Sequence, residues 1–237
     1  MKKISIVITA LSLSVATIAI ITKQKQLIVI RTDKIEKSNY TSAIKSETEK
    51  VSMLLDRGLK REKSGDYTEA IEDYTQAIQI NPANEFAYKH RGIAREKLGD
   101  YTEAIEDYTQ VIQINPKNEF AYNHRGIARE KLGDYTEAIE DYTQAIQINF
   151  DSAFAYKNRG VARFHLEDYS GAIEDYTEAI KIKPQAAFAY SYRGVARHKL
   201  GDISGATKDL QTAAKLFKKQ NNKIAHQQIT DMLENLE

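Results

Sequence analysis

Residues 85–118 read EFAYKHRGIAREKLGDYTEAIEDYTQVIQINPKN, and close variants of this stretch recur along the 237-residue chain. The most regular marker is a glycine that returns every 34 residues, at Gly58, Gly92, Gly126, Gly160 and Gly194. Residues 119–152 repeat residues 85–118 with changes at only five of 34 positions. A fixed period of this length is typical of stacked helical hairpins, in which neighbouring units bury a continuous core.

Small and turn-forming residues mark where each hairpin packs and bends. Gly92 and Ala104 are small, so the two helices of one hairpin can approach closely there. A second glycine follows the first helical segment, where a helix C-terminus needs a residue that tolerates positive φ. These glycines are Gly65, Gly99, Gly133 and Gly201. Candidate N-caps of the second helix come next, at Asp66, Asp100, Asp134, Asp168 and Asp202.

The three prolines of the chain, Pro82, Pro116 and Pro184, share one phase of the repeat. We expect the second helix of each unit to end there, because proline cannot continue a helix. Phe150 takes this phase in the third unit, and the fifth unit has Lys218 there, just before Gln220. The sequence therefore predicts a softer helix stop at Phe150 and a longer last helix near Gln220.

Tyrosines follow the same repeat. Of the 14 tyrosines, all but Tyr40 and Tyr192 share the three phases of Tyr88, Tyr101 and Tyr108. Aromatic side chains can stack on nucleic-acid bases, but a regular phase favours packing between helices. The fifth unit replaces two of these tyrosines with Ile203 and Leu210, which supports the packing interpretation.

Arginine and aspartate recur with equal regularity. The arginines are Arg57, Arg91, Arg125, Arg159 and Arg193, and the aspartates are Asp73, Asp107, Asp141, Asp175 and Asp209. A turn near Gly99 brings Arg91 level with Asp107, which predicts an Arg–Asp pair within each hairpin or across to the next. A semi-exposed pair is worth about 0–1 kcal/mol. The alternative is a ladder of arginines for acidic ligands; the structural pair is favoured because every arginine has its aspartate.

The spacing of Tyr88, Gly92, Ala104, Tyr108 and Pro116 resembles the tetratricopeptide pattern W-x2-L-G-x2-Y…A-x3-F…P. Tyrosine replaces the tryptophan and phenylalanine of that family, and Arg91 replaces its leucine. The repeat sequences are similar to those of bacterial, especially cyanobacterial, members. The resemblance covers five units, at residues 51–84, 85–118, 119–152, 153–186 and 187–220. It implies an all-α, right-handed superhelical solenoid of helix-turn-helix repeats, with the first helices lining a concave groove.

The first helix of each unit carries two stripes of residues spaced by three or four. In residues 85–98, the stripe of Tyr88, Arg91/Gly92, Arg95 and Leu98 is expected to pack on the second helix of the hairpin. The other stripe is left for the neighbouring unit and the groove. The candidate partner-binding residues on it and its counterparts are Phe86, Lys89, His90, Ile93, Phe120, Asn123, His124, Ile127, Phe154, Asn158, Phe164, His165, Phe188, Tyr192 and His198.

The first 22 residues differ from the repeats. Lys2 and Lys3 precede residues 4–22, a stretch of 19 residues without a charge, and about 17–25 apolar residues can cross a bilayer. Residues 1–22 are therefore an uncleaved signal-anchor, with the membrane as a partner through residues 4–22, a cleaved signal peptide, or neither. The first two alternatives predict a protein anchored by a single N-terminal helix, or exported to a periplasm, lumen or extracellular space. Residues 23–50 then form a polar spacer.

The end of the chain predicts one further amphipathic helix. Residues 221–237 are expected to cap the solenoid, since a terminal hairpin needs a cover with a polar outer face. Its apolar face would contain Ile224, Ile229, Met232, Leu233 and Leu236. Lysines make this end locally basic, at Lys208, Lys215, Lys218, Lys219 and Lys223. A solvated helix face explains them better than a membrane or nucleic-acid site.

Composition and motifs indicate binding rather than catalysis. Lysine and arginine number 34 against 33 acidic residues, a balance that gives no support to a nucleic-acid partner. Cysteine is absent, which excludes disulfides and cysteine-based catalytic or metal sites. The sequence contains no phosphate-binding loop, zinc-protease motif or hydrolase nucleophile motif. We therefore expect no enzyme activity, cofactor, metal or small-molecule substrate.

Histidine leaves one alternative open. His90 and His124 hold the same phase in adjacent units, and packed helices lie about 8–10 Å apart. Two imidazoles at this spacing could share a weak metal site or sense pH. The simpler interpretation is that they are two groove residues copied by duplication.

The sequence thus predicts a non-catalytic protein–protein interaction scaffold that binds a peptide or protein segment in the concave groove. The alternative is a structural or assembly factor that holds a membrane or envelope complex through its convex face or its ends. Residues 153–220 are more aromatic and less charged along the predicted groove. We expect a specific anchor there, because aromatic side chains are frequent interface hot spots.

Overall fold

The computed structural model describes residues 2–234, and within its first helix it describes the side chains only of residues 23–24, 26–31, 33–34, 37 and 41 onward. These residues form helices and no strand. The helices are α1 (Lys2–Ser64), α2 (Tyr67–Ile80), α3 (Glu85–Leu98), α4 (Tyr101–Ile114), α5 (Glu119–Leu132), α6 (Tyr135–Ile148), α7 (Ala153–His165), α8 (Tyr169–Ile182), α9 (Ala187–Lys199), α10 (Ile203–Lys219) and α11 (Lys223–Glu234).

The chain divides into two units, residues 1–53 and residues 54–237. In the first unit, the described side chains from residue 23 onward are exposed except for the half-buried Val51. Among the described residues, no helix has a segment long and apolar enough to cross a membrane. The apolar stretch 4–22, predicted to be a signal-anchor or signal peptide, lies outside the residues whose side chains are described.

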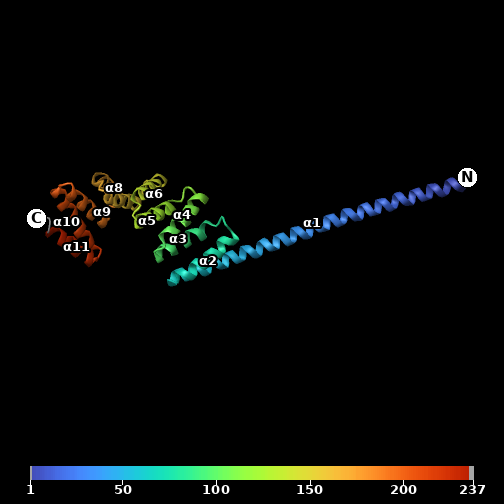
Figure 1. The fold of residues 1–237 in the computed structure, drawn as a ribbon, viewed down its shortest axis with the longest axis horizontal. Helices are drawn as coiled ribbons and strands as arrows, with labels where there is room; N and C mark the ends of the chain where they lie inside the picture. The colour runs from blue at the N-terminus through green and yellow to red at the C-terminus, as the bar shows by residue number, and fades with distance from the viewer. Residues whose placement is uncertain (1, 235–237) are drawn as a thin grey trace. The chain divides into compact units, whose positions relative to one another are not determined.

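The second unit is a solenoid of helical hairpins. The helices pair as α3 with α4, α5 with α6, α7 with α8 and α9 with α10, and each second helix also contacts the first helix of the next hairpin (Figure 1). The end of α1 forms a hairpin with α2, to which it is joined by hydrogen bonds from Arg57 to Asp73. The predicted all-α repeat architecture is therefore confirmed for this unit.

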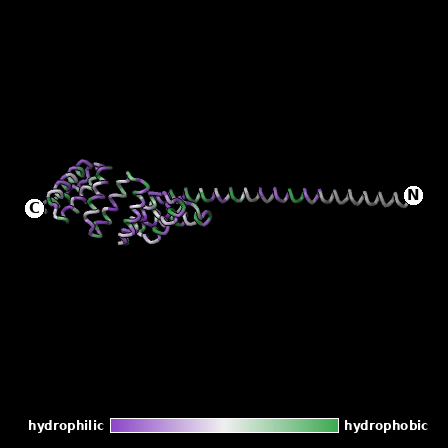
Figure 2. Tube along the Cα trace, turned by 90° about the horizontal axis from the view of Figure 1, so that it is seen from above, coloured by the Kyte–Doolittle hydropathy of each residue, from purple (hydrophilic) through white to green (hydrophobic). Residues whose placement is uncertain are grey.

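In the first four hairpins one tyrosine packs against one glycine, and in the fifth Leu210 packs against Gly194. A Cβ atom on Gly92 would lie 2.8 Å from Tyr108 Cε1, so the ring fits only because this position has no side chain. Tyr74, Tyr108, Tyr142 and Tyr176 are all buried, and the predicted packing role of this phase is confirmed. Alanine supplies most of the remaining core. Hydrophobic and hydrophilic residues are interspersed along the helices of the solenoid (Figure 2).

The turns within hairpins confirm the predicted glycine role with one exception. Gly99 has φ of 88° and caps α3, and Gly65, Gly133 and Gly201 share this left-handed conformation. In the fourth unit Glu167 occupies the phase with φ of 62°. A side chain is strained in this region, because its Cβ approaches the following carbonyl oxygen.

The second helices α2, α4, α6 and α8 end two residues before the proline phase, whether or not proline is there. α4 ends at Ile114 with Asn115 as C-cap, and α6 ends at the matching Ile148 with Asn149 as C-cap. The softer stop predicted at Phe150 is therefore wrong: the shared Asn and the loop after it end the helix at the same place. The longer last helix is confirmed, because α10 has 17 residues where α2, α4, α6 and α8 have 14.

All five predicted aspartates occupy the N-cap position, but only two use their side chains. Asp168 accepts a hydrogen bond from Gly171 N at 2.9 Å, and Asp202 accepts one from Gly205 N at 2.8 Å. The other three, Asp66, Asp100 and Asp134, form no side-chain cap bond, so that part of the prediction is wrong. A Cβ on Gly171 would collide with the Asp168 carboxylate. The matching position is glutamate in those three units.

The predicted Arg–Asp pair is present in every hairpin, and it is more deeply buried than expected. Arg91 donates from Nε and Nη2 to the Asp107 carboxylate at 2.7–3.2 Å and from Nη1 to Thr75 Oγ1 of the preceding hairpin at 2.9 Å. A second arginine, Arg95, donates to Asp107 Oδ2 at 2.8 Å and to the Glu103 carbonyl. Asp107 is 1 % exposed, so the predicted semi-exposed surface pair is wrong. It is a buried carboxylate between two guanidiniums.

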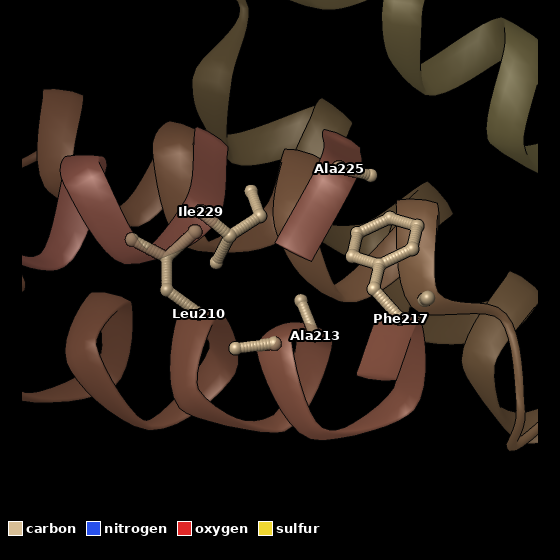
Figure 3. Packing of buried hydrophobic residues seen from close by; sticks show 7 residues of the cluster. Leu210, Ala213, Phe217, Ala225 and Ile229 are labelled. Atoms are coloured by element: carbon tan, nitrogen blue, oxygen red, sulfur yellow. The ribbon is translucent and has the colours of Figure 1, made fainter. Parts of the chain in front are cut away.

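The predicted C-terminal helix is present and covers the last hairpin. Leu210, Ala213 and Phe217 of α10 pack against Ala225 and Ile229 of α11 (Figure 3). Leu233 packs on the same cluster, as predicted. Ile224 was predicted for this face but is 76 % exposed, because the buried position one step along the helix is taken by the smaller Ala225. Met232 is also exposed, and Leu236 lies outside the described residues.

Candidate functional site

Helices α3, α5, α7 and α9 each carry a row of side chains that do not pack in the core of their own hairpin. Arg91, Gly92 and Arg95 contact α4, as predicted for the hairpin stripe. Leu98, predicted for the same stripe, is exposed at the end of α3. We call the second stripe and its counterparts the groove face; its first members are Phe86, Lys89, His90, Ile93 and Glu96.

A three-residue relay joins neighbouring units on the groove face. Tyr108 donates its hydroxyl to Glu96 Oε2 at 3.0 Å, and the Nδ1 atom of His124 lies 3.0 Å from the same oxygen. Tyr74, Glu62 and His90 form the same arrangement one unit earlier, with both distances 3.0 Å. Each carboxylate thus connects the buried tyrosine of its own hairpin to the histidine of the next.

The phenylalanines of α3 and α5 cover these histidines. The ring centroids of Phe86 and His90 are 4.1 Å apart, and those of Phe120 and His124 are 3.9 Å apart and stacked. The Lys89 ammonium lies 4.3 Å from the centroid of the Phe120 ring, a favourable cation–π distance. The groove face of α3 and α5 therefore satisfies most of its polar and aromatic groups internally.

His90 and His124 do not share a site. Each is paired with its own glutamate, Glu62 for His90 and Glu96 for His124. In the part of the chain that the structure describes, no group of three or more histidine, aspartate or glutamate side chains could hold a metal ion. The arrangement fits the simpler interpretation, in which the two residues were copied with their repeats.

The relay breaks at α7. Asn158 stands where the earlier units have histidine, so Glu130 receives the Tyr142 hydroxyl at 3.1 Å but no imidazole. Asn158 is buried, and so is Asn123 on α5, although both were predicted to face a partner. Asn123 Nδ2 donates to Glu119 Oε1 at 3.3 Å, while Asn123 Oδ1 has no hydrogen-bond partner among the described residues.

Aromatic side chains dominate the groove face from α7 onward. Phe154 is 47 % exposed and Phe188 is 51 % exposed. Phe188 also meets Phe217 edge to face, with centroids 4.8 Å apart. Tyr192 replaces histidine on α9 and stacks near Tyr176 at 5.7 Å. These residues give the face a more apolar surface than α3 and α5 provide.

The remaining predicted residues take different positions. Phe164 packs against the core cluster of Tyr176 and meets Tyr169 edge to face at 5.1 Å, so it serves the hairpin rather than a partner. His165 is exposed and stacks on Tyr135 of the preceding hairpin at 4.6 Å. His198 is exposed, and Ile93 and Ile127 are half-buried.

A hollow of about 300 Å³ opens beside Phe154 and Phe188. It lies between the first turns of α7 and α9 and the end of α8, and Lys157 and Lys183 reach it. Burial lowers the pKa of the Lys157 ammonium, against the opposing effect of the Glu130 carboxylate. Phe154 and Phe188 were predicted from the sequence and the two lysines were not, although alanine at Ala153 in place of the glutamate at Glu119 was visible in the sequence.

Family models match more than half of the 237 residues. The family described as "Tetratricopeptide repeat" matches residues 86–118, 120–152 and 153–185, and a model described as "TPR repeat" matches residues 62–99. No curated protein matches the chain.

Solved structures with the same fold are numerous. The crystal structure of MamA protein is 26 % identical, covers 74 % of this chain and 96 % of its own, and superposes with a TM-score of 0.69. MamA from Desulfovibrio magneticus RS-1, residues 41 to the end, is 20 % identical over 72 % of this chain and 97 % of its own, with a TM-score of 0.69. YrrB, described as a TPR protein with an unusual peptide-binding site, is 17 % identical over 81 % and 97 %, with a TM-score of 0.66.

Proposed function

Because the chain belongs to the tetratricopeptide repeat family, whose members are protein-interaction scaffolds, we propose that its groove face binds an extended segment of a partner protein. The segment lies along α3, α5, α7 and α9 and meets one set of side chains per repeat. Near-identical residues on α3 and α5 present two equivalent positions, and the aromatic residues of α7 and α9 present the anchor.

The exposure of the groove-face phenylalanines carries this proposal. Phe154 and Phe188 keep about half of their surface in contact with solvent, although the alanines of the same helices are mostly buried. Exposed aromatic residues that cluster on one face are typical of interaction sites.

The test compares two phenylalanine substitutions in the full-length protein. Phe154 lies on the groove face, while Phe150 is 70 % exposed in the loop after α6. We expect Phe154→Ala to lose most of the partner recovered by affinity capture, and Phe150→Ala to keep it. Circular dichroism of both variants controls for folding.

The outcome separates two uses of the solenoid. Full recovery of the same partner by well-folded Phe154→Ala would contradict groove binding. It would favour an assembly factor that holds its complex through the convex face or the ends. Loss of the partner in both variants would point to a surface near the α6–α7 loop rather than to the groove.

We also propose a membrane role for residues 4–22, which rests on their charge-free, 19-residue apolar sequence alone. The segment either anchors the protein by one N-terminal helix or directs its export. Fractionation of cells expressing the full chain, with mass determination of the N-terminus, tests both. Recovery in a membrane fraction with Met1 intact is expected for an anchor, and a soluble product beginning after residue 16 is expected for a cleaved signal. A soluble, uncleaved chain in the cytoplasm would refute both.

A further inference from the structure

The helices α3 and α5 both begin with a glutamate that binds the following inter-hairpin loop. Glu85 Oε1 accepts hydrogen bonds from Asn115 Nδ2 at 3.2 Å and Asn118 Nδ2 at 2.6 Å. Glu119, 34 residues later, accepts from Asn149 Nδ2 at 2.8 Å and from Ser152 Oγ at 2.6 Å. A carboxylate of the chain itself therefore fills the space between α3 and the α4–α5 loop, and another fills the space between α5 and the α6–α7 loop.

The next unit keeps the space but not the carboxylate. The counterpart of Glu119 is Ala153, and the counterparts of Asn149 and Ser152 are Lys183 and Ala186. Ala153, Lys183 and Ala186 all line the hollow of about 300 Å³. The hollow is thus the place that a glutamate fills one unit earlier, with a lysine where the hydrogen-bonding asparagine stood.

Charge and shape around the hollow are complementary to an acidic side chain beside an apolar one. Lys157 and Lys183 line it without any acidic residue. Neither lysine forms a salt bridge with a described residue, although the Glu130 carboxylate partly offsets the effect of burial on Lys157. Phe154 and Phe188 supply apolar walls. Partial burial lowers the pKa of the Lys157 ammonium, so a carboxylate placed there would compensate a charge that water solvates poorly.

We propose that the hollow receives a glutamate or aspartate side chain of the bound partner segment, with a neighbouring apolar side chain packed between Phe154 and Phe188. This inference rests on the proposed groove binding and adds the chemistry of the residue pair that anchors there. The partner's carboxylate takes the place of the Glu119 carboxylate and pairs with Lys157 and Lys183. A side chain is favoured over a chain terminus, because the group that fills the equivalent space in α3 and α5 is itself a side chain.

The experiment uses a phage-displayed library of random 12-residue peptides, selected on the full-length protein. The recovered peptides are synthesised with a fluorescent label, as free acids and as C-terminal amides, and their binding is measured by fluorescence polarisation. We expect recovered sequences to share an acidic residue next to Leu, Ile, Met or an aromatic residue. Replacing that acid by its amide should weaken binding on the order of tenfold, the effect of losing one charge-assisted contact. Amidating the C-terminus should leave binding unchanged.

Two protein variants make the test specific for the hollow. Ala153→Glu restores the glutamate of α3 and α5 and fills the hollow from within, so it should weaken the same peptides at least tenfold. Ala83→Glu adds the same charge in the exposed α2–α3 loop and should leave binding unchanged. Lys157→Gln should also weaken binding. Thermal unfolding of each variant controls for folding, since Ala153 is only half-buried.

The outcomes separate this inference from the proposed function. Peptides that bind, lose affinity in Phe154→Ala and are unaffected by Ala153→Glu would keep groove binding and overturn the acidic subsite. Loss of binding on C-terminal amidation would overturn it as well, because the carboxylate would then be a terminus. A library that yields no groove-binding peptide would overturn both.

Discussion

At the scale of single residues, each hairpin of this solenoid contains a buried aspartate that is paired with arginine. Asp107 is 1 % exposed and is held by Arg91 and Arg95 through charge-assisted hydrogen bonds. Burial raises the pKa of Asp107 against the lowering effect of the two arginines. Removing one partner of a buried pair costs more than the pair contributes, because the other charge is left without compensation.

We predict that Arg91→Leu destabilises the protein by about 2–4 kcal/mol at pH 7. The variant leaves Asp107 with Arg95 alone and removes the bond from Arg91 Nη1 to Thr75 Oγ1. Urea unfolding followed by circular dichroism measures the change. The double variant Arg91→Leu/Asp107→Asn should recover part of the loss, because it removes the uncompensated charge.

The pH dependence of Arg91→Leu has a definite sign. Without Arg91, the pKa of Asp107 in the folded state rises further above the value in the unfolded chain. Such a group contributes stability below its unfolded pKa and loses it as pH rises through the folded pKa. The deficit relative to wild type should therefore be smaller at pH 5 than at pH 8. A deficit that is the same at both values, or no deficit, would contradict the buried-charge account.

Glu167 offers a stabilising substitution at the same scale. It holds φ of 62° where other units have glycine, and a left-handed residue with a side chain costs about 1–2 kcal/mol, partly offset by the greater unfolded-state entropy of glycine. Glu167→Gly should stabilise the protein by about 0.5–1 kcal/mol. The matched change Glu174→Gly, at an exposed position within α8, should destabilise it by about 1 kcal/mol. A loss of stability in Glu167→Gly, measured by urea unfolding, would contradict the strain.

At the scale of helices, the N-caps distinguish two kinds of second helix. Asp168 caps α8 with its side chain and Asp134 stands at the same position of α6 without a cap bond. We predict that Asp168→Ala costs about 1 kcal/mol, the usual value for a lost N-cap, and that Asp134→Ala costs much less. Thermal unfolding of the two variants gives the comparison. Equal losses would show that the capping bond is not the source of the difference.

The 34-residue period predicted which segments are helical and which residues share a helix face. It did not predict which neighbouring helix each face contacts. Glycine, tyrosine and arginine phases predicted the hairpin contacts because these residues meet within one repeat. Ile224 and Leu98 were misplaced, because a helical period defines a face without saying where the neighbouring helix ends. Asn123 was predicted to face a partner, yet it is 5 % exposed. No single repeat contains that information.

At the scale of the whole described solenoid, four buried tyrosines in successive hairpins together determine how stability changes at alkaline pH. Burial first, and then the Glu96 and Asp107 carboxylates, raises the pKa of Tyr108 well above its usual range. The same direction holds for Tyr74, Tyr142 and Tyr176. A tyrosine with a raised pKa contributes stability that is present below the unfolded pKa of about 10 and is lost above it.

We therefore predict that the protein unfolds as pH rises above about 10, with the four buried tyrosines ionising only as the helices are lost. Absorbance at 295 nm and circular dichroism at 222 nm, recorded on one sample, make the comparison. The exposed tyrosines should ionise first without loss of helix. Complete ionisation of all tyrosines with unchanged helix content would contradict the prediction.

The candidate site was only partly predictable from the sequence at this scale. Phe154 and Phe188 were identified because they share a repeat phase with Phe86 and Phe120. The hollow required the structure, because Ala153 and Lys183 are 30 residues apart and meet only through the turn between α8 and α9. The substitution of Ala153 for glutamate was visible, but its consequence depended on which loop Glu119 binds.

The bond from Arg91 to Thr75 has a consequence for how this chain evolves. The same bond joins Arg125 to Thr109, Arg159 to Thr143 and Arg193 to Thr177. If recombination between the near-identical coding stretches removed residues 85–118, Arg125 would meet Thr75 across an unchanged junction. Whole units can thus be gained or lost without inventing a new interface, and natural selection can lengthen or shorten the groove in steps of one repeat while the divergent hollow at its end stays intact.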